Sequence, residues 1–471
     1  MPKKSFLVLT SLPISLLLVF SACAPIPVTM SPLVTNTQAP SRKTPSPSPT
    51  ASPARIEVSP GALNGVSLKV SYAFTGTSAS FFNDQLAEFN TLNPWGITLY
   101  PTPGGSYNIL FETVSAQIGS PEQPDLVITL PEQVLAWDEQ GAILDLQPYL
   151  LDPRYGFTKS DLDDFEPIFW GGSGQDDKRL GLPALLSSHF IFYNQTWAQE
   201  LGFKKPPFTS TEFREQACAA NQSFRQDLDL RNDGYGGWIV NTDPTAVLAW
   251  MLAFGGGVVR DGHYTFPTRE NHTALDFLKI LYDDGCAYLS TEPTPYLSFA
   301  RRSTLFITGT LAEIPDQMLT FEQAGNNDQW TLIPFPGQMN RLVAEGPQYT
   351  LLRSTPEKQL AAWLFVRWLL STENQVRWVE ATGMFPLRTS AMEALSSYRR
   401  DHKQWAAAIN YMEDLAIQPE LASWRTGRLV LGDAAQSIFR LNLTSDQIST
   451  ALVQMDQTMQ ELTERKVTPT P

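Results

Sequence analysis

Histidines are the first residues to test for chemistry, because an imidazole can hold a metal ion or move a proton near neutral pH. The chain has four, His189, His263, His272 and His402, and none has a second ligand at the spacing that metal sites on helices or loops use. The sequence also lacks a GxSxG nucleophile elbow, a P-loop and a dinucleotide-binding glycine motif. We therefore expect no metal, no cofactor and no catalysis. A carboxylate pair for glycoside hydrolysis stays open, because such pairs come from distant positions.

One acidic stretch, residues 227–234, has part of a calcium-loop pattern. Counted from Asp229, Asp233 and Gly234 take the fifth and sixth positions, but Arg231 takes the third and Val240 the twelfth. A calcium loop needs oxygen ligands at the third and twelfth positions. The stretch is therefore interpreted as a polar turn that leads into a strand, with calcium as the alternative.

The tryptophans are candidates for ligand contact, since the flat face of an indole can stack on a sugar ring. The chain has twelve, and packing in a core is their more common role. Five lie in or near predicted loops or element ends: Trp95, Trp137, Trp170, Trp250 and Trp424.

The first sixty residues predict export. Lys3 and Lys4 precede an apolar run over residues 6–20, and Ser21-Ala22-Cys23 follows, which is the pattern of a secretory signal in residues 1–22. A cysteine directly after small residues resembles a lipobox, in which Cys23 is acylated and becomes the mature N-terminus. An ordinary cleavage at the same small residues is the alternative. Residues 23–60 are rich in Pro, Ser and Thr and predict an extended linker.

This arrangement predicts an extracytoplasmic protein that is lipid-anchored to the cell membrane. Cys218 and Cys286 remain as a pair, and an oxidising exterior favours a disulfide between them over two buried free thiols. No second apolar run is long enough to span a bilayer.

Composition limits the class of protein further. About 410 residues remain after the leader and the linker are removed. A single hydrophobic core rarely serves a chain of that length, so two domains are expected. The formal net charge is −14, which argues against nucleic acid as a partner.

Strands and helices alternate at the start of this body. Residues 66–72, 97–100 and 125–129 are predicted strands, separated by predicted helices over 82–92 and 109–118. This order predicts βαβ units, a parallel sheet and an α/β fold. Further strands are expected at 191–193 and 238–240, and a helix after the capping box that begins at Thr209. Residues 391–465 are predicted to be helical, and 466–471 to form a frayed tail.

Several motifs in the middle of the chain occur in a recognisable order. They are Gly181-Leu182-Pro183, Phe192-Tyr193-Asn194-Gln195-Thr196-Trp197 and Pro206-Pro207-Phe208-Thr209-Ser210-Thr211-Glu212-Phe213. The run resembles the extracellular solute-binding proteins of ABC importers, above all the sugar-binding group that includes maltose-binding protein. Ser210 and Thr211 stand where that group commonly has tryptophan and aspartate. Later segments that resemble the group include Phe306-Ile307-Thr308-Gly309-Thr310-Leu311-Ala312 and Thr382-Gly383-Met384-Phe385-Pro386-Leu387-Arg388.

The resemblance implies a periplasmic-binding-protein-like fold, with two α/β lobes of doubly wound sheets that close on a ligand by hinge motion. Lobe I is expected to comprise 61–183 and 303–333, and lobe II 184–302 and 334–390, with helices over 391–465 packed on them. Crossovers are expected near Pro183, Arg302 and Pro334. The implied partners are ABC permease subunits, and the protein is expected to be a monomer.

The ligand site should lie between the lobes, outside the carboxyl ends of the strands. This rule nominates residues that directly follow the predicted strands. Other residues are nominated because they lie in a predicted loop or at a position that approaches the ligand in the family. The nominated residues are Thr75, Thr77, Gly105, Ser106, Glu132, Asn241, Asp243, Trp250, Glu313 and Trp424. Thr75, Thr77 and Asn241 are equally well explained as caps of turns and helices.

A carbohydrate is the expected solute. The alternative is a non-sugar solute, such as a polyamine or phosphodiester, or a role as a sensory partner. A cell-surface glycoside-active enzyme is the remote alternative.

Overall fold

The computed structural model describes residues 55–172, 174–175, 178–440 and 443–467. The predicted leader, the predicted lipid attachment at Cys23 and nearly all of the linker lie outside these residues. In the part of the chain that is described, no helix has both the length and the apolar character needed to cross a membrane.

The first sheet has five strands in the order β2-β1-β3-β15-β6. Its strands are β1 (Ser67–Tyr72), β2 (Thr98–Pro103), β3 (Leu126–Thr129), β15 (Gln348–Leu351) and β6 (Leu182–Pro183). The first three are parallel to one another, whereas β15 is antiparallel to β3 and β6. α1 (Gly76–Leu92) and α2 (Tyr107–Gln117) connect the parallel strands, so the predicted α/β alternation is confirmed.

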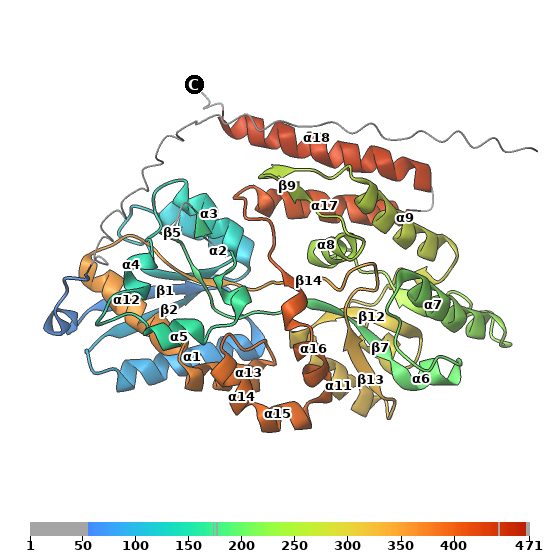
Figure 1. Cartoon of the computed structure of the whole chain (residues 1–471), viewed down its shortest axis with the longest axis horizontal. Coiled ribbons are helices and arrows are strands. Elements are labelled where there is room, and N and C mark those ends of the chain that lie inside the picture. The colour runs from blue at the N-terminus through green and yellow to red at the C-terminus, as the bar shows by residue number, and fades with distance from the viewer. Residues whose placement is uncertain (1–54, 173, 176–177, 441–442, 468–471) are drawn as a thin grey trace, which may run out of the picture. The chain divides into compact units, whose positions relative to one another are not determined.

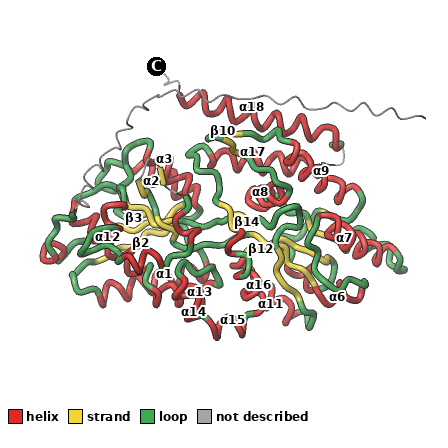
Figure 2. Tube along the Cα trace, viewed as in Figure 1, coloured by secondary structure: helices red, strands yellow, loops and turns green. Residues whose placement is uncertain are grey.

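The second sheet has the order β11-β8-β12-β7-β13. Its strands are β7 (His189–Asn194), β8 (Gly236–Ile239), β11 (Ala287–Tyr288), β12 (Thr304–Thr310) and β13 (Trp330–Ile333). β8 is parallel to β11 and β12, and β7 is antiparallel to β12 and β13. Figure 2 shows the strands gathered in these two groups, each surrounded by helices.

Three long helices belong to the second sheet: α7 (Ser210–Arg225), α8 (Pro244–Ala253) and α9 (Arg269–Asp283). α7 begins with the predicted capping box, in which Thr209 Oγ1 accepts from the Glu212 amide and Glu212 Oε2 accepts from the Thr209 amide. A disulfide joins Cys218 on α7 to Cys286, which lies between α9 and β11.

Strand pairing corrects part of the expected lobe assignment. β12 and β13, which fall in residues 303–333, pair with β7 and not with the first sheet. α12 (Pro356–Leu369) packs on β1 and β15 of the first sheet, and α13 (Thr372–Thr382) packs on α1, although residues 334–390 were expected in lobe II. The expectation was wrong because sequence order does not determine which sheet a later strand joins.

The chain passes between the sheets three times. It leaves the first sheet after β6 and returns along the segment between β13 and β15, which contains β14 (Leu342–Val343). A third passage follows α15 (Ser396–Asp401), because the next helix, α16 (Lys403–Ile409), packs on β13. The passage expected near Arg302 does not occur, since Arg302 lies in the turn before β12, within the second sheet's own elements.

The C-terminal part is less helical than expected, because residues 410–423 contain β16 (Leu415–Ala416), which pairs with β14. α17 (Trp424–Ile438) contacts α8 and also α3 (Pro131–Asp138), and α18 (Ile448–Val467) lies over α17 and α9 (Figure 1). α17 therefore contacts elements of both sheets.

The remaining elements are short. They are α4 (Gln147–Leu150), α5 (Lys159–Asp163), α6 (Gln195–Glu200), α10 (Tyr296–Ala300), α11 (Ile314–Gln323), α14 (Thr389–Ala394), β4 (Gly174–Gln175), β5 (Lys178–Arg179), β9 (Val259–Arg260) and β10 (His263–Tyr264).

Candidate functional site

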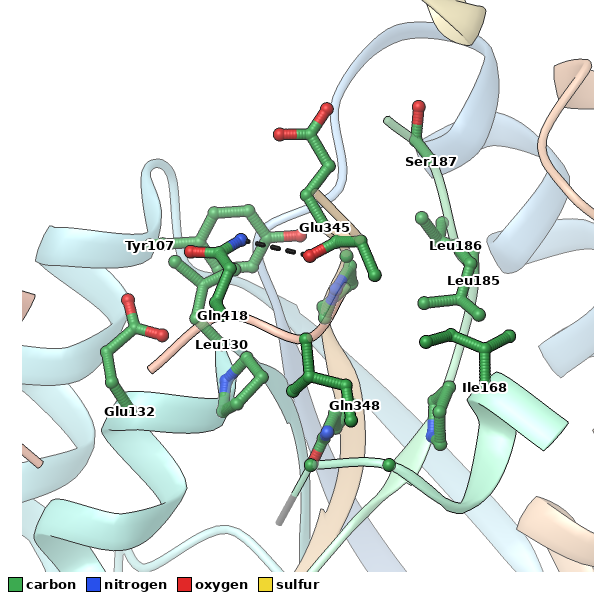
Figure 3. Close-up of a pocket in the computed structure, with 18 of the residues that line it drawn as sticks. Tyr107, Leu130, Glu132, Ile168, Leu185, Leu186, Ser187, Glu345, Gln348 and Gln418 are labelled. Carbon is green, nitrogen blue, oxygen red and sulfur yellow. Dashed lines mark hydrogen bonds between the residues drawn. The ribbon is translucent and has the colours of Figure 1, made fainter. Parts of the chain in front are cut away.

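A cavity of about 500 Å³ lies between the two sheets. Tyr107 after β2, and Leu130 and Glu132 after β3, form one side (Figure 3), and Ser106 after β2 also belongs to the lining. These loops meet there because the carboxyl ends of parallel strands share one edge of a sheet. Thr310, at the end of β12, lies in the lining from the second sheet.

The crossover segments and the C-terminal part complete the lining. The segment after β6 contributes Leu185, Leu186 and Ser187, the segment between β14 and β15 contributes Glu345, and β15 itself contributes Gln348. Residues beyond β16 contribute Gln418 and Glu420, and α17 contributes Arg428. Two of the passages between the sheets, those after β6 and before β15, thus line this cavity.

Glu132 and Arg428 form an ion pair in the lining. Arg428 Nη2 lies 2.9 Å from Glu132 Oε1, and the Glu132 side chain is only 3% exposed. Pro131 at the first position of α3 places Glu132 in the first helical turn, where the helix dipole favours a negative charge. The pair joins α3, which follows the first sheet, to α17, which packs on α8.

Several buried polar atoms of the lining have no hydrogen-bond partner among the described residues: Glu132 Oε1, Ser187 Oγ and Arg428 Nε. The 2.9 Å contact between Glu132 and Arg428 lacks the direction of a hydrogen bond, so it does not satisfy these atoms. Leaving a buried polar atom unpaired costs about 1–3 kcal/mol. A solute that offers donors and acceptors would recover that free energy.

His189 is buried beside a second carboxylate of the lining. Its Nδ1 lies 3.4 Å from Glu345 Oε1 and its Nε2 lies 3.8 Å from Asp243 Oδ1. Burial alone would lower the pKa of His189, but Glu345, Asp243 and Glu313 outweigh it and raise that pKa to about 9. The imidazole is therefore charged at neutral pH and balances Glu345.

A third carboxylate, Glu420, is also placed opposite a cation. Burial raises the pKa of Glu420, whereas the charge of Arg179 acts in the opposite direction. Each of the three carboxylates, Glu132, Glu345 and Glu420, thus has a cationic neighbour. A lining with balanced charges suits a neutral polar solute better than an ion.

Two of the nominated residues line the cavity, Ser106 and Glu132. Ser106 also caps α2, since its Oγ accepts from the Ile109 amide at 3.3 Å. Gly105, with φ +71°, permits the turn that precedes Ser106 but is not part of the lining. Thr75 and Thr77 are exposed at the start of α1, outside the lining.

Asn241 and Asp243 stabilise the start of α8. Asn241 Oδ1 accepts from the Asp243 amide, and Asp243 Oδ1 accepts from the Thr245 amide, both at 2.8 Å. Neither residue lines the cavity, although Asp243 reaches His189. The alternative role given to Asn241, as a cap, matches this geometry.

Trp250 packs in the core and does not offer a stacking face. Its side chain has 0% exposure, and its ring contacts those of Phe213, Trp238 and Phe335. The nomination of Trp250 is corrected on this ground: α8 is apolar nearly all round and is buried on every side.

Trp424 and Glu313 support the lining from behind. Trp424 is fully buried, and its Nε1 donates to Gln418 Oε1 at 3.0 Å. Glu313 accepts from the Thr310 amide at 2.5 Å and from the Tyr296 hydroxyl at 2.7 Å. Both residues therefore position residues of the lining without being part of it.

The residues that sequence reasoning missed are Tyr107, Ser187, Glu345, Gln348, Gln418 and Arg428. Ser187 and Glu345 follow the crossovers that were expected near Pro183 and Pro334, so that expectation contained a usable signal. No sequence signal pointed to Arg428, because a single arginine on an amphipathic helix cannot be told from an ordinary solvated charge.

The acidic stretch after α7 is held by its own side chains. Arg231 Nε and Nη2 donate to the two oxygens of Asp229 at 2.7 and 2.8 Å. Across the described residues, no group of three or more His, Cys, Asp or Glu is placed to hold a metal ion.

A family model described as bacterial extracellular solute-binding protein matches residues 84–413. Among curated proteins, one of Brucella abortus that carries the name of a binding protein is 22% identical over 378 residues, which cover 78% of this chain and 86% of the relative.

Solved structures share the fold at low identity. The sugar-binding protein MalE of Xanthomonas citri has a TM-score of 0.72 at 19% identity, over 85% of this chain and 98% of its own. UgpB of Mycobacterium tuberculosis, solved with glycerophosphocholine, has a TM-score of 0.71 at 14% identity, over 86% of this chain and 100% of its own. The maltodextrin-binding domain of Bdellovibrio bacteriovorus, bound to maltotriose, has a TM-score of 0.65 at 19% identity, over 85% and 100%.

Proposed function

Because the chain belongs to the bacterial extracellular solute-binding proteins, we propose that it binds a neutral carbohydrate in the cavity between its sheets and delivers it to an ABC permease. The observation that carries the choice of solute is the set of buried polar atoms that make no hydrogen bond, on Glu132, Ser187 and Arg428. Sugar hydroxyls both donate and accept, so they can pair with a carboxylate, a hydroxyl and a guanidinium at once.

The size and charge of the cavity support the same choice. A volume of about 500 Å³ falls in the range of small-molecule sites and suits a monosaccharide or a short oligosaccharide. Each lining carboxylate has a cationic neighbour, so neither a polyamine nor an anion would meet an uncompensated charge. Two of the solved relatives are sugar-binding proteins by their names.

Tyr107 takes the stacking role that was expected of a tryptophan. It is the one aromatic side chain among the described residues that line the cavity. Figure 3 labels Tyr107 and Gln418 among the side chains that line the site. A sugar ring can place its C–H face on this phenol, which fixes the plane of the ring.

Binding would favour a closed arrangement of the two sheets. Glu132 and Ser106 follow strands of the first sheet, whereas Thr310 ends a strand of the second. A solute that pairs with both sides binds the closed state more tightly than the open one, and this difference in affinity shifts the population. The permease would then distinguish loaded from empty receptor by shape, without any reaction on the solute.

The tether is part of the proposal. A lipid on Cys23 and an extended linker over 23–60 would hold a monomeric receptor outside the membrane, within reach of its permease.

A glycerophosphodiester is the second candidate, favoured by the relative that was solved with glycerophosphocholine. A phosphodiester would have to compete with Glu132 for Arg428. This competition makes it the weaker candidate.

A thermal-shift panel of maltose, maltotriose, glucose, spermidine and glycerophosphocholine tests the proposal. A solute at 100 times its Kd stabilises the folded state by about 2.7 kcal/mol, which is a readily measured rise in Tm. We expect a sugar to raise Tm, and Glu132→Gln to reduce that rise. Stabilisation by spermidine or glycerophosphocholine alone would overturn the carbohydrate, and hydrolysis of the sugar during incubation would overturn the role of receptor.

A further inference from the structure

A second cavity, of about 580 Å³, lies between α11, α13, α15 and α16. Figure 1 shows these helices side by side at the lower edge of the view, between the two sheets. The lining is mostly apolar and includes Leu311, Ile314, Met318, Leu319 and Trp405. Met318 and Leu319 are 43% and 52% exposed, so apolar surface is open to a ligand.

The second cavity is separate from the first, although both use the same two segments. Thr310, Ala312 and Met384 line the first cavity, whereas Leu311 and Gly383 line the second. Residues 310–312 thus alternate between the two cavities, and in the second segment Thr382 and Gly383 line the second cavity whereas Met384 lines the first. A ligand in the second cavity would therefore not occupy the solute site.

Charge gives the second cavity its chemical preference. Glu322 on α11 and Glu380 on α13 both belong to its lining, and no arginine or lysine does. Within the part of the chain that the structure describes, neither carboxylate has an ion pair or a hydrogen bond. The Tyr398 ring completes the lining next to Glu380, with one face stacked on His402 at 3.8 Å.

We propose that this second cavity binds a small organic cation, in which an ammonium group is carried on an apolar body. The apolar body would cover the side chains of α11, and the ammonium would lie near the carboxylates of Glu322 and Glu380. An anion of the same size would meet two negative charges without compensation. The preference for a cation over its neutral and anionic counterparts is therefore the distinguishing property of the site.

The probe is hexylammonium chloride, compared with hexan-1-ol and sodium hexanoate, which share its apolar chain. Methionine methyl groups labelled with carbon-13 report on each cavity by NMR, because Met318 lines the second cavity and Met384 the first. Their signals are assigned from Met318→Leu and Met384→Leu. We expect hexylammonium to shift the Met318 signal saturably and hexanoate to leave it unmoved.

The charge-neutral variant Glu322→Gln/Glu380→Gln tests whether the two carboxylates cause the preference for a cation. Both carboxylates are exposed, so the variant should fold, and we expect it to bind hexylammonium about fivefold more weakly. The reference is Glu357→Gln, a half-buried glutamate on α12 outside this cavity. Equal binding of hexylammonium and hexanoate, equal affinity in both variants, or an unmoved Met318 signal would each overturn the proposal. A sugar that shifts only Met384 would still support the solute site.

Discussion

Trp424 Nε1 donates a hydrogen bond to Gln418 Oε1 at 3.0 Å. Gln418 Nε2 then donates to the Ala344 carbonyl at 3.2 Å, as Figure 3 shows. A buried indole on α17 thus fixes the amide of a lining residue, and that amide holds the segment between β14 and β15. Trp424 thus shapes the proposed solute site, although it has no surface of its own in that cavity.

Trp424→Phe should therefore weaken solute binding. Loss of one hydrogen bond that positions Gln418 costs about 1 kcal/mol, which is roughly a fivefold rise in Kd. Trp250→Phe is the matched control, because Trp250 is equally buried but its Nε1 has no hydrogen-bond partner among the described residues. Calorimetric titration of both variants with the solute from the thermal-shift panel measures the difference. An equal rise in Kd for both would contradict the role given to Trp424.

Glu132 and Arg428 should show coupled effects on stability. Glu132→Gln or Arg428→Gln alone leaves a buried or half-buried charge without its partner, so each should lower the free energy of unfolding by about 1–3 kcal/mol. The double variant should cost less than the sum of the two. Urea unfolding of the four proteins gives the coupling free energy.

The more exposed pair of Arg425, on the same helix as Arg428, and Glu112, on α2, serves as a control. Its charged atoms are 3.6 Å apart and Glu112 is 69% exposed, so its coupling should be close to zero. Additive effects at Glu132 and Arg428 would show that their contact contributes nothing.

His189 should make stability depend on pH. Its pKa is about 9 in the folded protein, against 6.5 as the ordinary value. A raised pKa means that the folded state binds the proton more tightly, so the contribution is complete below about pH 6.5 and is lost as pH rises through about 9. The contribution is roughly 3 kcal/mol.

Urea unfolding from about pH 6 to about pH 9.5 checks this dependence. In His189→Gln the loss of stability at high pH should disappear. His263→Gln should keep the pH profile of the parent protein, because His263 is exposed. The carboxylates that face His189 are those of Glu345, Asp243 and Glu313. The same pH profile in His189→Gln and the parent would refute the assignment.

The disulfide should stabilise the second sheet's helices. Cys218 and Cys286 are 68 residues apart, and a loop of that length corresponds to about 4 kcal/mol of chain entropy. Reduction, or Cys218→Ser/Cys286→Ser, should lower the free energy of unfolding by up to that amount. Two free thiols titrated in the unfolded, unreduced protein would show that the bond does not form.

Cys23→Ser should release the protein from membranes. If Cys23 carries the lipid, the variant loses its anchor and moves to the soluble fraction outside the cytoplasm. Fractionation of expressing cells checks this outcome, with Cys218→Ser as the control that keeps Cys23. An unchanged membrane fraction would argue for another anchor.

The first half of the fold was the more predictable half. Leu68 and Val70 lie at alternate positions and Leu126–Thr129 is an apolar run, so local pattern located β1 and β3, and position after a predicted strand nominated Ser106 and Glu132. The pairing of β12 with β7 depends on contacts across more than 100 residues, which no local pattern records. Trp250 and Trp424 look alike in sequence, and only packing shows that one belongs to the core and the other holds the site.

The residues that line the cavity come from distant parts of the chain, and this affects how relatives can be sorted by ligand. The family model matches residues 84–413, whereas Gln418, Glu420 and Arg428 lie beyond that match. Tyr107, Glu132, Ser187 and Glu345 lie inside the match, so the lining is shared between the matched core and the stretch that follows it. Relatives that are sorted by ligand should therefore be aligned over residues 414–428 as well as over the matched core.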